Sequence, residues 1–170
     1  MQSKKRSAGF TMIELVVVIA ILGILAAVAL PRFINVSDQA HESAVKGAGG
    51  ALASAVLLVR AQWEVNRNSG TATPNLNVAG FGANNVDVNT AGWPVGIDDG
   101  ATIGSAADCL AIWNNVLQGS APTVATATGS DYQVTRAGQV CTYTYQLQNV
   151  NDTITYDAAN GTVVTVFTTP

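Results

Sequence analysis

Gly9-Phe-Thr-Met-Ile-Glu-Leu-Val-Val-Val-Ile-Ala-Ile-Leu-Gly-Ile-Leu-Ala-Ala-Val-Ala-Leu-Pro31 is the stretch of sequence that decides the fold. Residues 10–30 carry one charged side chain, Glu14. A helix of this length crosses the hydrocarbon core of a bilayer, which takes about 20 apolar residues. Three adjacent cations lie just before it, at residues 4–6. Because cations beside an apolar span stay in the cytoplasm, we expect the rest of the chain to face the other side of the membrane.

Three interpretations of this stretch compete. A cleaved secretory signal has a shorter apolar core, of about 7–15 residues, and no carboxylate within it. A plain membrane anchor fits the length but leaves Glu14 unexplained, because a carboxylate at mid-bilayer costs about 2.5–3.5 kcal/mol. Its partner would be the membrane interface, another chain, or a newly made amine. The third interpretation supplies that amine, because cleavage between Gly9 and Phe10 exposes the amino group of Phe10 close to Glu14.

The same residues resemble the N-terminus of a type IV pilin of class a, the class with a short basic leader. The resemblance covers roughly residues 1–60 and rests on the motif Gly9-Phe-Thr-Met-Ile-Glu14. It implies that prepilin peptidase removes the leader, residues 1–9, by cutting between Gly9 and Phe10, and that Phe10 is then N-methylated. It also implies that Phe10 and Glu14 act in assembly, with Glu14 pairing with the N-terminal amine of a neighbouring subunit.

A long helix is expected over residues 10–67, of which 10–30 form the membrane or filament-core part. Pro31 removes a backbone donor and crowds the preceding turn, so we expect a kink there. A second kink is expected at Gly23, the glycine within the apolar run. Beyond Pro31 the pattern becomes amphipathic, and Gly70 is suited to the left-handed turn that ends a helix. The small residues at 47–51 have two explanations, close packing on a sheet, which we favour, or close crossing of neighbouring helices in a filament.

Residues 68–170 are expected to form a globular head, so the fold class is α+β. A long loop over 70–104 contains short turns or strands, in which Trp93 and Phe81 are expected to pin the loop to the head. Ser105-Ala-Ala-Asp108 has the capping-box outline and predicts a short helix over 105–118. From 131 to 168 the period changes to two, which predicts a four-stranded antiparallel meander covering the amphipathic half of the long helix. The pilin resemblance implies the same fold, with a disulfide-bounded C-terminal region.

The two cysteines, Cys109 and Cys141, are predicted to form one disulfide, because an even, low count in an exported chain is typical of an oxidising compartment. They lie 32 residues apart. A metal site would need more ligands nearby. Asp98-Asp99-Gly100 lacks the alternating ladder of a calcium loop and is interpreted as a solvated turn. The single histidine, His41, is interpreted as a solvated helix residue.

Charge and motifs exclude several classes of function. Without residues 1–9 the chain keeps five basic and eleven acidic side chains, a net charge of −6. Nucleic-acid binding needs clustered Lys and Arg, which are absent from the sequence beyond residue 9. Nucleophile elbows, phosphate loops and histidine-rich sites are absent too, so neither an enzyme nor a bound cofactor or metal is expected.

The expected function is that of a structural subunit of an extracellular filament for adhesion and surface attachment. The partners implied by the resemblance are further copies of the chain in a helical filament, prepilin peptidase, the inner-membrane assembly machinery, and the membrane before assembly. The implied location is the inner membrane and then the pilus of a Gram-negative bacterium. Gly92-Trp-Pro94 further resembles the pilins of mannose-sensitive haemagglutinin pili. The rival interpretations are a pseudopilin of a type II secretion system and a membrane-tethered enzyme or binding module.

Overall fold

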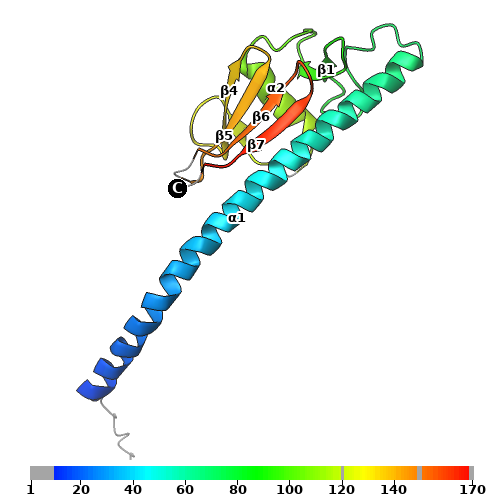
Figure 1. Cartoon of the computed structure of the whole chain (residues 1–170). Helices are drawn as coiled ribbons and strands as arrows, with labels where there is room; N and C mark the ends of the chain where they lie inside the picture. Colours follow the sequence, from blue (N-terminus) through cyan, green and yellow to red (C-terminus); the bar gives the residue numbers. More distant parts are fainter. Residues whose placement is uncertain (1–9, 120, 149–150, 169–170) are drawn as a thin grey trace, which may run out of the picture. The chain divides into compact units, whose positions relative to one another are not determined.

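The computed structural model describes residues 10–119, 121–148 and 151–168, without the side chains of residues 34 and 35. A single long helix, α1 (Met12–Asn68), comes first (Figure 1). The other elements, in chain order, are β1 (Asp87–Val88), β2 (Pro94–Gly96), α2 (Ala106–Val116), β3 (Val124–Ala125), β4 (Tyr132–Ala137), β5 (Val140–Tyr145), β6 (Thr153–Asp157) and β7 (Thr162–Val166). Two compact units result, Met1–Ala40 and His41–Pro170, so residues 41–68 of α1 belong to the same unit as the strands. We call this second unit the head.

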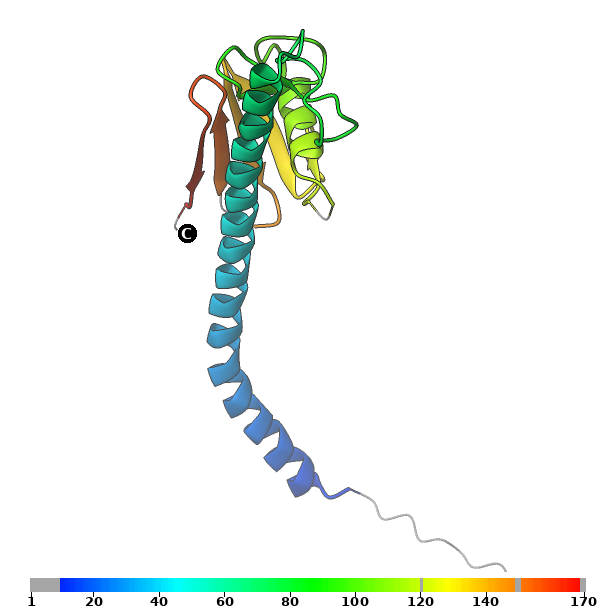
Figure 2. The same cartoon turned by 90° about the vertical axis from the view of Figure 1, so that its right-hand side faces the viewer.

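Helix α1 is unbroken through Pro31 and ends where its sequence predicts. Gly70 adopts φ +77°, the left-handed conformation that an L side chain resists, and the amide of Thr71 donates to the carbonyl of Asn66 over 3.1 Å. Inside the head one face of α1 is buried, and its side chains share one core with those of α2 and the sheet. Figure 2 shows this part of α1 running alongside α2 and the strands. The buried side chains of α1 there are Val45, Ala48, Leu52, Ala55, Val56, Val59 and Trp63.

Of the three glycines at positions 47, 49 and 50, only Gly49 is explained by close packing of the helix on the sheet. A Cβ on Gly49 would overlap the side chain of Thr165 in β7, so this glycine lets the helix lie close against the sheet, as favoured. At Gly47 and Gly50 a Cβ would meet open space. Packing within the head therefore explains Gly49 and leaves the other two glycines exposed.

The large sheet has five strands in the order β3-β4-β5-β6-β7, and it is mixed, so the expectation of four antiparallel strands is wrong. Strands β4 to β7 form the predicted antiparallel meander. The additional strand, β3, pairs in parallel with β4. It has only two residues and no alternating pattern, and a side chain fixes it from outside: the carboxylate of Asp131 accepts from the amide and hydroxyl of Thr123, at 2.8 and 2.9 Å.

The disulfide between Cys109 and Cys141 joins α2 to β5, with 5.5 Å between the two Cα atoms, as predicted. The hydroxyl of Tyr143 donates to the carbonyl of Cys109 over 2.8 Å, and burial raises the pKa of this tyrosine. Helix α2 begins with the predicted capping box, in which Ser105 caps the helix and Asp108 accepts from the Ser105 amide at 2.8 Å. These contacts fix the short helix on the sheet.

Trp93 anchors the long loop between two other parts of the head. The guanidinium of Arg60 in α1 lies over its ring, with 4.2 Å between Cζ and the ring centroid. On the β6–β7 turn, Gly161 approaches the same ring so closely that a Cβ there would overlap it. The indole is 8% exposed. The prediction that Trp93 pins the loop is confirmed, and Phe81, named with it, is partly buried against the same core. The loop also contains the small sheet of β1 and β2.

A buried carboxylate organises the same loop. Asp87 in β1 has no exposed surface, and its two oxygens accept from the backbone amides of Asn77 and Asp99, at 2.9 and 2.7 Å. Both partners have positive φ, +55° and +62°, which Asn and Asp tolerate better than most residues. Asp87 therefore holds two tight turns together from one position.

Candidate functional site

The candidate site lies in the first turn of α1, around Glu14. One carboxylate oxygen, Oε2, accepts from the backbone amide of Thr11 at 2.8 Å and from the Thr11 hydroxyl at 2.7 Å. In return the Glu14 amide donates to the Thr11 hydroxyl oxygen at 3.3 Å. This is a capping box, in which the first helical residues satisfy each other's backbone donors. The arrangement follows from local sequence, since a threonine and a glutamate three residues apart form it at a helix start.

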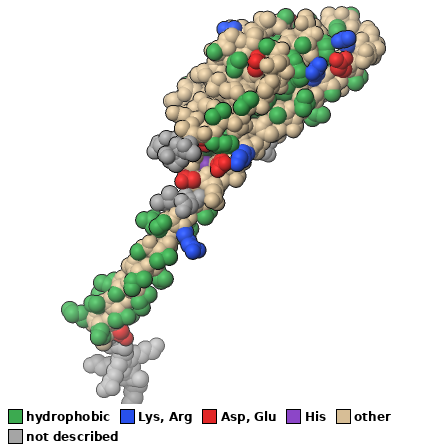
Figure 3. All heavy atoms as spheres, viewed as in Figure 1, with side chains coloured by type: hydrophobic (Ala, Val, Ile, Leu, Met, Phe, Trp, Pro, Cys, Tyr) green, Lys and Arg blue, Asp and Glu red, His purple; other side chains and the backbone are tan. Residues whose placement is uncertain are grey.

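Around the carboxylate the surface is apolar. A shallow hollow beside Glu14 is lined by Phe10, Ile13, Val17 and Val18. Side chains of this kind cover the visible face of residues 12–30, where those of the large apolar residues are 47–85% exposed (Figure 3). By length and composition, α1 is the one helix among the described residues that is able to cross a membrane. The site is thus a single carboxylate on the otherwise apolar first part of α1, residues 12–30.

Such a site has a clear chemical requirement. A carboxylate in apolar surroundings loses its hydration and needs hydrogen-bond donors or a cation in its place. Thr11 supplies two donors to Oε2, and the positive end of the α1 dipole adds to their effect. No described residue donates a hydrogen bond to Oε1. The arrangement is therefore suited to receive one further donor, and a cation most of all.

The predicted site residues fall partly within the described chain. Gly9, on one side of the expected cleavage point, lies outside the described residues. Phe10 precedes α1, is 85% exposed and lines the hollow beside Glu14. Gly23 and Pro31 both lie inside α1, and a Cβ at Gly23 would meet open space. The kinks at these two positions stay predictions.

The structure also shows the surroundings of the two other candidate positions, the turn at residues 98–100 and His41. Among the described residues, no three His, Cys, Asp or Glu side chains lie together as a metal site would need. Asp98 accepts from the amide of Gly100 at 3.3 Å, as an aspartate in a turn does. His41 is not simply solvated, because its Nδ1 lies 2.7 Å from the hydroxyl of Tyr145, a hydrogen bond between α1 and β5.

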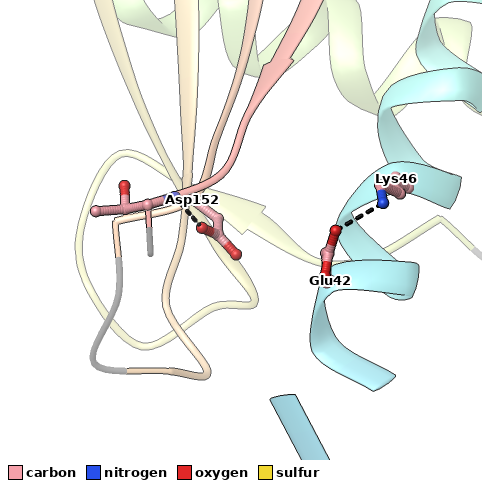
Figure 4. Close-up of polar contacts among 4 residues, drawn as sticks. Glu42, Lys46 and Asp152 are labelled. Atoms are coloured by element: carbon pink, nitrogen blue, oxygen red, sulfur yellow. Dashed lines mark hydrogen bonds and ion pairs between the residues drawn. The ribbon is translucent and has the colours of Figure 1, made fainter. Parts of the chain in front are cut away.

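Polar contacts also hold the chain after β7. The buried carboxylate of Asp152 accepts from the amide of Thr168 at 2.9 Å (Figure 4). On α1, Lys46 forms an ion pair with Glu42 at 2.6 Å, and its Nζ lies 5.1 Å from the centre of the Phe167 ring. These contacts are structural, and they hold the end of the chain and one side of α1 within the head.

Sequence reasoning missed Thr11. It sought the partner of Glu14 among cations, the membrane interface and other chains, and the structure places the first partner in the same helical turn. The signal was available, because Thr11-Met-Ile-Glu14 has the same capping-box spacing that located α2 at Ser105.

Residues 4–30 match the model of the prokaryotic N-terminal methylation motif. This range contains Gly9, Phe10 and Glu14, and it covers the apolar part of α1 up to the residue before Pro31. No solved structure matches the chain.

The similar curated proteins match over the N-terminal part. The type IV narrow pilus major component PilA5 of Thermus thermophilus is 46% identical over 57 residues, which are 34% of this chain and 49% of that protein. The type IV major pilin protein PilE1 of Neisseria gonorrhoeae is 40% identical over 84 residues, 47% of this chain and 51% of that protein. The type II secretion system core protein G of Pseudomonas aeruginosa is 43% identical over 53 residues, 31% and 37% of the two chains. The chain thus spans about half or less of the length of these relatives.

Proposed function

We propose, from the premise that this chain belongs to the type IV pilin family, that it is a structural subunit of an extracellular filament. The observation that carries the proposal is the N-terminal methylation motif over residues 4–30, on a helix whose exposed apolar surface carries one carboxylate. An apolar surface of this length is stable only in a membrane or against other apolar helices. A subunit that moves from bilayer to filament meets both conditions with the same residues.

Processing is the first step of the proposed function. Prepilin peptidase removes residues 1–9 by cleavage between Gly9 and Phe10, and Phe10 is N-methylated. The basic leader holds the precursor in the inner membrane of a Gram-negative bacterium, with the head outside the cytoplasm. The motif match supports this proposal, because it covers both sides of the cleavage point.

Assembly is the second step. Helices from residue 10 to 30 bundle in the filament core, where the carboxylate of Glu14 pairs with the N-terminal amine of Phe10 in a neighbouring subunit. Such a pair removes two opposite charges from the apolar core together, whereas loss of one partner leaves the other stranded. One heterologous contact repeated without closure gives a helical fibre. The kinks proposed at Gly23 and Pro31 adapt the helix to this packing, and the inner-membrane pilus machinery drives it.

Adhesion and surface attachment through the pilus complete the proposal. Gly92-Trp-Pro94 supports a narrower assignment to the pilins of mannose-sensitive haemagglutinin pili. In this chain the segment has a structural role as well, because Trp93 lies against Arg60 and Gly161.

The second candidate is a pseudopilin of a type II secretion system, which the similarity to core protein G favours. The disulfide between Cys109 and Cys141 and the long meander favour the pilin, because major pseudopilins as a family tend to use a calcium loop instead. A membrane-tethered binding module has no observation of its own in support. Shearing of cells and detection of the subunit in the released fibres distinguishes the pilin from the pseudopilin.

Replacement of Glu14 by alanine tests the proposal. We expect Glu14→Ala to abolish surface filaments while the subunit remains in the membrane with Phe10 exposed and methylated, as read by N-terminal mass spectrometry. Glu42→Ala is the matched control, since it removes a glutamate of the same helix that pairs with Lys46, and it should leave filaments normal. Normal quantities of filament from the Glu14 variant refute the assigned role, and a mature chain beginning at Met1 refutes the processing.

A further inference from the structure

We propose that Thr11 is the residue that positions Glu14 for subunit docking. The proposal rests on the assembly role of Glu14 given above. It begins from geometry, because the Thr11 hydroxyl is used twice: it donates to Oε2 of Glu14 at 2.7 Å and accepts from the Glu14 amide at 3.3 Å. With the Thr11 amide, which donates to Oε2 at 2.8 Å, three hydrogen bonds connect these two residues at the start of α1.

The two oxygens of the Glu14 carboxylate differ in their contacts. Both donors of Thr11 reach Oε2, and no described residue donates a hydrogen bond to Oε1. A charged group held through one oxygen is restricted in its rotamers and presents the other oxygen in a fixed direction. Without the hydroxyl, only the Thr11 amide still holds Oε2, so the incoming amine must supply more of the ordering of Glu14, and that ordering opposes docking.

The contacts also act before docking. They use atoms of Thr11 and Glu14 alone, so they are the same whether the chain begins at Met1 or at Phe10. An unassembled subunit therefore has donors for its carboxylate while it waits in the bilayer, where water is scarce. Thr11 holds Glu14 in one geometry from membrane insertion until a second copy supplies the amine.

Two substitutions separate positioning from folding. Thr11→Val has nearly the same shape without the hydroxyl, whereas Thr11→Ser keeps the hydroxyl and loses only a methyl group. In cells producing the full chain, we expect Thr11→Val to lower sheared filament about tenfold, because the amine must then order the Glu14 side chain at a cost of about one factor of ten in docking. We expect Thr11→Ser to give filament near the wild-type level.

Two readouts show whether the loss arises at Glu14. The membrane pool of each variant should be cleaved and N-methylated at Phe10 as in the wild type, by mass spectrometry. In full chain labelled at the Glu14 carboxyl carbon and held in detergent micelles, Thr11→Val should move the ¹³C resonance and Thr11→Ser should not. A mere effect on α1 length would leave this resonance in place.

The outcomes are distinct. Wild-type filament from Thr11→Val overturns the positioning role, and the proposed function stands if Glu14→Ala still fails to assemble. Loss of cleavage or methylation in Thr11→Val assigns Thr11 to processing and also overturns the positioning role. Normal filament from Glu14→Ala removes the assembly role of Glu14 and with it the ground for Thr11.

Discussion

Gly161→Ala is predicted to destabilise the head strongly for two separate reasons. Gly161 adopts φ +75° on the β6–β7 turn, where an L side chain costs about 1–2 kcal/mol. Its Cβ would also overlap the ring of Trp93, and the displacement of a packed ring or turn costs about 1–3 kcal/mol. The free energy of unfolding should therefore fall by about 2–5 kcal/mol in total.

Gly138→Ala is the matched control for the backbone cost. Gly138 lies on the β4–β5 turn with φ +62°, and a Cβ there would meet open space. Its replacement should cost about 1–2 kcal/mol from the backbone alone. The difference between the two variants measures the contact with Trp93, and in a Trp93→Ala background that difference should disappear.

Thermal unfolding of the full chain in detergent micelles provides the assay. The three tryptophans, at positions 63, 93 and 113, all lie in the head, so their fluorescence reports its unfolding. At about 4 °C per kcal/mol, Gly161→Ala should melt about 4–12 °C below Gly138→Ala. Equal melting temperatures for the two variants would show that Trp93 is not held against the turn, and the account of how the loop is anchored would fail.

Three further predictions concern single features of the head. Joint replacement of Cys109 and Cys141 by serine should lower the free energy of unfolding by about 3–4 kcal/mol, read from the urea midpoint, and an unchanged midpoint would contradict the predicted role of the disulfide. Asp87→Asn should cost about 1–3 kcal/mol in the same assay, because an amide group then faces one of two backbone N–H donors; a neutral result would mean that the loop does not depend on this carboxylate. Gly47→Ala should stabilise α1 by about 0.8–1 kcal/mol, while Gly49→Ala, which meets β7, should not, and equal gains from both would place the sheet too far from the helix.

Local signals in the sequence predict much of this fold. The change to a period of two locates β4 to β7, and Ser105 with Asp108 locates the start of α2. Gly70 locates the end of α1 within two residues. Each of these signals acts between residues close in sequence, where turn geometry, capping and side-chain alternation are decided by the few residues themselves.

Contacts between distant residues are where sequence reasoning ended. Strand β3 has no alternating pattern, and a side chain eight residues later fixes it through Thr123 and Asp131. Gly161 lies on the turn between β6 and β7, and its contact with Trp93 depends on how the loop returns to the sheet. The same holds for Gly49, whose neighbour Thr165 lies in the last strand. Their partners follow from the three-dimensional arrangement and not from spacing along the chain.

The candidate site differs from these cases, because the contact that sequence reasoning missed there joins two residues only three positions apart, Thr11 and Glu14. A carboxylate in an apolar stretch suggests a distant cation, yet the first turn of any helix carries amides without partners, and Glu14 lies among them. The start of the helix therefore supplies hydrogen-bond donors for one oxygen of the carboxylate, Oε2, from the neighbouring residue Thr11. The other oxygen, Oε1, accepts no hydrogen bond from any of the described residues. One oxygen of the Glu14 carboxylate is hydrogen-bonded within its own helix, and the other is available to a second subunit. Removal of such a side chain is expected to affect association between subunits more than the stability of the fold. On this ground we expect Glu14 variants to fold and insert as the wild type does and to differ only when subunits meet.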